Sequence, residues 1–92
     1  MGPFNKGELP IPPAAAADER AVEIVRVWAA GGKQHVSLAS HAWSDPAAWG
    51  IMLVDLARHV ANAYAARGAK SYENALARIR DGFDAEWTNP TT

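Results

Sequence analysis

The sequence predicts a small α+β domain with a short N-terminal helix, a β-hairpin, and two antiparallel helices packed on one face of the small sheet. Residues 23–39 mirror themselves in residue type about a Gly-Gly pair, which predicts the hairpin. A strong helix start precedes residues 47–68, and residues 71–88 carry apolar side chains at helical spacing. These three observations carry the fold prediction.

Length and composition set the domain count. The chain has 92 residues, of which 49% are hydrophobic and 21% are charged, as in an ordinary globular protein. We expect an extended arm over residues 1–13, one globular α+β domain over 14–88 and a short tail over 89–92. A domain of this size is close to the limit at which a single core suffices, so a partner subunit often supplies the rest.

Charge and cysteine content exclude several classes of function. The formal net charge is −1 and no basic stripe is present, so we expect no nucleic-acid partner. The chain has no cysteine, which removes disulfides, thiol nucleophiles and zinc–thiolate sites. No apolar run approaches the length of a membrane span or a signal peptide, so we expect a cytoplasmic protein with no membrane partner.

The first 22 residues predict an extended arm and a short helix. Four prolines and two glycines punctuate residues 1–13, and proline fixes φ and removes a backbone donor, so this segment favours neither a helix nor a central strand. The next segment, Ala14 to Val22, is rich in helix formers and contains the acids Asp18 and Glu19. It is typical of a short helix whose end the sequence does not define.

The hairpin prediction rests on residues 23–39. Gly31 and Gly32 permit a two-residue turn with positive φ, and β-branched residues alternate around Arg26. Folding there places opposite one another Val25 and Leu38, Val27 and Val36, and Trp28 and His35. Ala21, Ile24, Val25 and Trp28 also fit a helical face, so a helix that continues through Trp28 is the alternative.

Two helices follow the hairpin. Asp45 can cap free amides and Pro46 suits a first helical position, so a helix should begin there and end near Gly68. Its apolar stripe consists of Trp49, Met52, Leu53, Leu56, Val60, Ala63 and Tyr64. Ser71 can cap the last helix, which should end at Asn89-Pro90. The apolar face of that helix consists of Tyr72, Leu76, Ile79, Phe83 and Trp87.

A two-stranded sheet needs further support. In water such a ribbon is marginally stable and leaves two unpaired edges. The prolines argue against a third strand from the arm, so a second copy of the chain is the better source. We therefore expect a homodimer.

Three long segments resemble a known family. They are RVWAAGGKQHVSLA, DPAAWGIMLVDLARHVANAYA and ARIRDGFDAEW. Together they are similar to short proteobacterial proteins that form a domain of unknown function, over roughly Leu9 to Trp87. The resemblance implies one small bacterial domain and carries no activity, cofactor or catalytic residue.

Two groups of residues are candidate binding sites. Arg26, Trp28 and His35 share one hairpin face, where an indole beside a guanidinium can stack on a ring or receive a partner's side chain. The alternative is that the arm or the first helix covers this face and makes Trp28 part of the core. Asp55 and His59 lie four residues apart on the second helix, as in a carboxylate that orients a general base, or as in a helix-side ion pair.

Metal and cofactor sites have little support. His35, His41 and His59 with Asp55 could supply a metal set, but their spacing matches no familiar pattern, so we expect no metal site. We expect Trp43, Trp49 and Trp87 to clasp one another as a core lid, with an aromatic ligand pocket as the alternative. No phosphate-binding loop is present, and we expect no cofactor.

The functional hypothesis follows from these expectations. The chain is interpreted as a non-catalytic protein-interaction module that self-associates, with room for a further protein partner. The alternative is a small-molecule-binding protein or minor enzyme that uses Asp55 and His59 near the junction of hairpin and helix.

Overall fold

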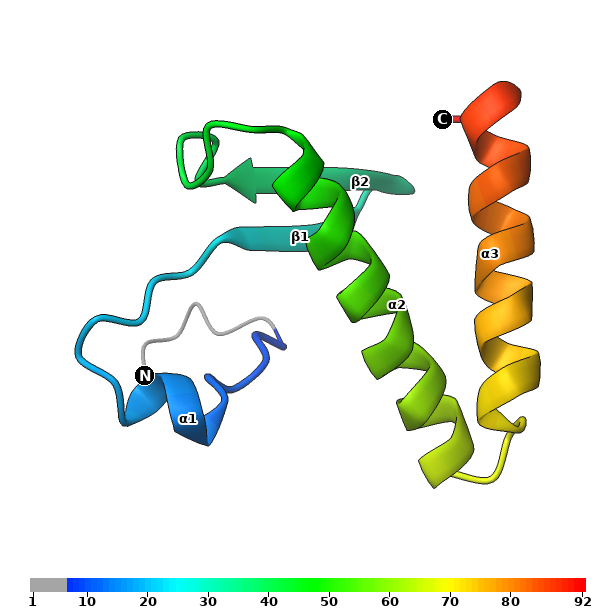
Figure 1. Cartoon of the computed structure of the whole chain (residues 1–92), viewed down its shortest axis with the longest axis horizontal. Helices are drawn as coiled ribbons and strands as arrows, with labels where there is room; N and C mark the ends of the chain where they lie inside the picture. The colour runs from blue at the N-terminus through cyan, green and yellow to red at the C-terminus, as the bar shows by residue number, and fades with distance from the viewer. Residues whose placement is uncertain (1–6) are drawn as a thin grey trace. The chain divides into compact units, whose positions relative to one another are not determined.

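The computed structural model describes residues 7–92 and confirms the α+β class (Figure 1). Its elements in chain order are α1 (Pro13–Ala16), β1 (Val25–Ala30), β2 (Lys33–Leu38), α2 (Ala47–Ala66) and α3 (Tyr72–Thr88). The chain forms two compact units, Met1–Ala42 and Trp43–Thr92, which are described in turn. The packing of the helices on the hairpin and the single domain over residues 14–88 stay predictions.

The arm and α1 open the first unit. Residues 7–12 form neither helix nor strand, as expected from their prolines, and the first six residues of the predicted arm lie outside the described residues. Helix α1 is shorter than predicted and ends at Ala16 rather than near Val22. Asp18 explains the difference, because its side chain accepts a hydrogen bond from the Arg20 amide at 2.9 Å and competes with helical pairing.

The hairpin has the predicted register. Strands β1 and β2 are antiparallel and form a two-stranded sheet. The paired residues are Val25 with Leu38, Val27 with Val36, and Trp28 with His35. Gly31 and Gly32 have φ values of 61° and 74°, which a two-residue type I′ turn requires and which glycine adopts without strain. The alternative helix through Trp28 is thereby excluded.

Local hydrogen bonds satisfy backbone groups at both ends of α2. The Asp45 carboxylate accepts from the Ala47 amide at 3.0 Å, and Pro46 directly precedes the helix. At the other end Gly68 has a φ of 72°, and the Ala69 amide donates to the Tyr64 carbonyl at 3.1 Å in a Schellman arrangement. The predicted start and stop of this helix are confirmed.

Helix α3 begins and ends where the sequence predicts. The Ser71 hydroxyl accepts a hydrogen bond from the Asn74 amide at 3.1 Å, and the helix ends at Thr88 before Asn89 and Pro90. Side chains one turn apart form exposed ion pairs on its polar side, Arg78 with Asp81 and Arg80 with Asp84. Each such pair stabilises a helix by only a few tenths of a kcal/mol, about 0.3 to 0.5.

The two helices of the second unit are in contact, and they lie closest near the loop that joins them and diverge toward their other ends (Figure 1). The two buried apolar residues among residues 7–92 are Ala61 and Ala75, one from each helix, with exposures of 0% and 3%. We call these two buried positions the alanine seam. Leu53, Leu56 and Val60 of the predicted stripe remain exposed within this unit.

Candidate functional site

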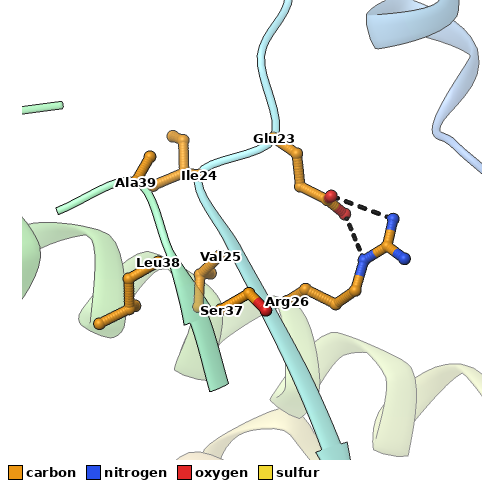
Figure 2. Close-up of a pocket in the computed structure, with 7 residues that line it drawn as sticks. All are labelled: Glu23, Ile24, Val25, Arg26, Ser37, Leu38 and Ala39. Carbon is orange, nitrogen blue, oxygen red and sulfur yellow. Dashed lines mark hydrogen bonds and ion pairs between the residues drawn. The ribbon is translucent and has the colours of Figure 1, made fainter. Parts of the chain in front are cut away.

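The best-defined cluster of interactions in the hairpin unit is centred on Arg26. The guanidinium contacts the Glu23 carboxylate through Nε at 3.1 Å and Nη2 at 3.0 Å, as Figure 2 shows. Its Nη1 contacts the Glu8 carboxylate of the arm at 2.6 Å. These contacts, chiefly the hydrogen bond to Glu23, raise the pKa of Arg26 above its ordinary value. The cluster ties the arm to the hairpin.

Two hollows flank β1. The smaller, of about 230 Å³, lies at the open end of the hairpin between residues 23–26 and 37–39 (Figure 2). The larger, of about 460 Å³, is lined by residues 7–9 of the arm, by Glu23 and by residues 25–28 of β1. Consecutive residues of a strand point to opposite faces, so a hollow lined by residues 25–28 in succession follows the outer edge of β1. Residues 7–9 of the arm face β1 across this hollow.

The predicted binding residues Arg26, Trp28 and His35 lie on one hairpin face. Arg26 and Trp28 are partly buried and His35 is exposed. The His35 Nε2 atom lies 3.1 Å from the Ala30 carbonyl oxygen. Trp28 lines the larger hollow together with the arm. The arm therefore covers Trp28 in part, which agrees with the alternative in which this residue belongs to the core. Trp28 is nevertheless not fully buried.

The opposite face of the hairpin is apolar and uncovered within its unit. We call the side chains of Val25, Val27, Val36 and Leu38 the apolar face. Val27, Val36 and Leu38 are 53%, 47% and 57% exposed, and every residue of β2 is exposed. Contiguous exposed apolar surface usually marks an interaction site.

Asp55 and His59 form the contact that their spacing predicts. The His59 Nε2 atom lies 3.3 Å from an Asp55 carboxylate oxygen, and the two side chains are 74% and 70% exposed, His59 first. No described charged or polar side chain is buried, so nothing in residues 7–92 shields this pair from water. An exposed pair of this kind resembles the helix-side ion pair more than an oriented general base.

The tryptophans do not form one described cluster. Trp43 and Trp49 meet edge to face with ring centroids 5.0 Å apart. Trp87 instead stacks on Phe83 with centroids 5.5 Å apart, and its side chain is 75% exposed. The expectation of a three-tryptophan lid is therefore met only by the first pair.

The described residues offer neither a metal-ligand cluster nor a membrane span. Over residues 7–92, no three His, Cys, Asp or Glu side chains gather in a group that could hold a metal ion. No helix within that range combines the length and the apolar character needed to cross a bilayer.

Sequence reasoning missed two carboxylates. Glu8 is 18 residues from Arg26, and no local pattern pairs an arm residue with a strand residue. Glu86 accepts hydrogen bonds from the Thr91 amide at 2.6 Å and the Thr92 amide at 3.2 Å. These bonds, chiefly the one from the Thr91 amide, lower the pKa of Glu86 below 4.5. The sequence did contain a signal for this contact. An acidic residue stands shortly before the Asn-Pro pair that ends the helix, and two threonines follow that pair.

Comparison with known proteins agrees with the family resemblance. The model of a domain of unknown function, DUF5076, matches residues 8–91. No curated protein matches the chain. A similar solved structure is described as "Structure of a putative pyruvate dehydrogenase from the photosynthetic bacterium Rhodopseudomonas palustrus CGA009". It is 36% identical in sequence, with a TM-score of 0.70, over 92% of this chain and 87% of that one.

Proposed function

We propose that this chain, which belongs to the domain of unknown function DUF5076, is a non-catalytic protein-interaction module that self-associates as a homodimer. Because the family name gives no role, the proposal rests on the surface of the chain itself. The observation that carries this proposal is the exposed hairpin. A two-stranded ribbon is marginally stable in water, and the second strand of this one is wholly exposed while its apolar face is left uncovered by its own unit.

The helical unit supports the same proposal. Its two buried residues are alanines, whereas larger apolar side chains such as Leu53 and Leu56 stay exposed. Burial of apolar surface contributes about 25 cal/mol per Å², so side chains of the size of leucine stabilise a fold only when something covers them. A second copy doubles the apolar surface that can be buried and needs no other gene product.

Static light scattering tests the proposal at protein concentrations of tens of micromolar. The expected mass is twice the 9.9 kDa of the chain, with dissociation on dilution as mass action requires. Protein carrying His59→Ala should keep the dimer mass, since the proposed interface does not use that exposed pair. A mass of one chain at every concentration would contradict self-association.

A second candidate is a small-molecule-binding protein or minor enzyme that uses Asp55 and His59. The 3.3 Å contact between these side chains favours it, as does the activity named for the similar solved structure. Native mass spectrometry of the purified protein tests it. A copurified ligand that His59→Ala loses would support this candidate, and an apo mass with no pyruvate-dependent reduction of an electron acceptor would remove it.

A further inference from the structure

Along each strand of the hairpin, backbone N–H and C=O groups point either inward to the other strand or outward to the edge of the sheet. The Ala39 amide donates to the Ile24 carbonyl at 2.9 Å, so residues 24 and 39 form a hydrogen-bonded pair. Hydrogen-bonded and non-hydrogen-bonded pairs alternate along an antiparallel ladder. Given the register, Gln34, Val36 and Leu38 are non-hydrogen-bonded partners of β1, and their N–H and C=O groups point away from it. These three residues define the outer edge of β2.

The two edges of the hairpin differ. Arm residues 7–9 line a hollow together with residues 25–28 of β1, and Glu8 contacts Arg26. No described segment pairs with the outer edge of β2, because the sheet consists of β1 and β2 alone over residues 7–92. Proteins usually protect an open edge with proline, a bulge or charge. In β2 the charged residue is Lys33 at the turn end, and residues 34–38 contain no proline, Lys, Arg, Asp or Glu.

We propose that two copies of the chain join through the outer edge of β2, antiparallel and about a two-fold axis at Val36, to give a four-stranded sheet. This inference rests on the proposed self-association and specifies its surface. Val36 then pairs with Val36 of the second copy, and Gln34 with Leu38. The outward backbone groups of these residues close three hydrogen-bonded pairs.

The side chains fit this register. Ser37 falls opposite His35, and Lys33 falls opposite Ala39, so no like charges meet across the new ladder. The apolar faces of the two hairpins lie on the same side of the joined sheet, because the two paired Val36 side chains point to the same side. The pairing also leaves that apolar face free for the helices that the sequence predicts to pack on it.

Single cysteines test the geometry, since the chain has none of its own. In the proposed sheet the two Cα atoms at position 36 are about 5.5 Å apart, which suits a disulfide. Position 27 lies on the same face and is similarly exposed, but its two copies are separated by three strand spacings, roughly 14 Å. Val36→Cys is therefore the probe and Val27→Cys its matched control.

The expected result under a mild oxidant is a disulfide-linked dimer of Val36→Cys that forms about tenfold or more faster than that of Val27→Cys. Light scattering of both reduced variants accompanies the test. A dimer mass with equal or faster linking at position 27 would overturn the β2 edge and leave self-association standing. A monomer mass for both reduced variants and for the unaltered chain would overturn both.

Discussion

The helical unit and the hairpin unit both owe their elements to local signals, but they differ in what they bury. Helices α2 and α3 are capped by Asp45, Gly68 and Ser71, and each of them buries one alanine. The hairpin is set by its Gly-Gly turn, yet no residue of its strands is buried. Local chemistry can thus specify a secondary structure without supplying the cover that stabilises it.

The largest expected effect is at the alanine seam. Ala61→Glu places a carboxylate where the wild-type side chain is 0% exposed, and a buried unpaired charge costs about 3 kcal/mol or more. We expect loss of helical circular dichroism at a lower temperature or urea concentration. Ala65→Glu, on an exposed position of the same helix, is the control. Equal effects of the two substitutions would mean that the seam does not hold the helical unit together.

Replacement of the turn glycine Gly32 should destabilise the hairpin. Gly32→Ala forces a Cβ onto a residue with a φ of 74°, and a left-handed conformation costs a non-glycine residue about 1 to 2 kcal/mol. No neighbouring atom lies within 4 Å of the added Cβ, so the cost is conformational. Faster amide exchange at Arg26 and Trp28, whose N–H groups point inward, measures it. Unchanged exchange would show that the turn does not limit hairpin stability.

The same substitution in α3 should have the opposite sign. Gly82 lies inside the helix without a positive φ, and a methyl group at its Cβ position would meet open space. Gly82→Ala should therefore stabilise the helical unit by about 1 kcal/mol or slightly less. A thermal melt followed by circular dichroism measures the gain. A destabilised variant would imply that α3 is covered at this position by something outside its own unit.

The smallest expected effect concerns the segment that follows α3. Because the pKa of Glu86 is lowered in the folded protein, its bonds to Thr91 and Thr92 are fully present above pH 4.5 and are lost as pH falls through the lowered value. The Thr91 amide resonance should follow that titration, whereas the amides of α2 should not. In Glu86→Gln the acid-dependent shift should vanish, and a shift that persists would assign it to another group.

Sequence could predict what depends on neighbouring residues. The hairpin register follows from the position of Gly31 and Gly32, and the helix ends follow from Ser71 and Gly68. The end of α1 was left open by the sequence, and it lies where the Asp18 side chain accepts from the Arg20 amide in competition with helical pairing. Glu8 was missed because its partner Arg26 is distant in sequence and only the folded arm brings them together.

A second copy that completes the hairpin at the outer edge of β2 is the central claim about this protein. Amide hydrogen exchange measured at low and high protein concentration tests it most directly, because Val36 and Val27 both point their N–H groups outward, from opposite edges. We predict that exchange at Val36 slows as concentration rises while exchange at Val27 does not. Exchange at Val36 that stays the same at every concentration, as at Val27, would contradict the claim.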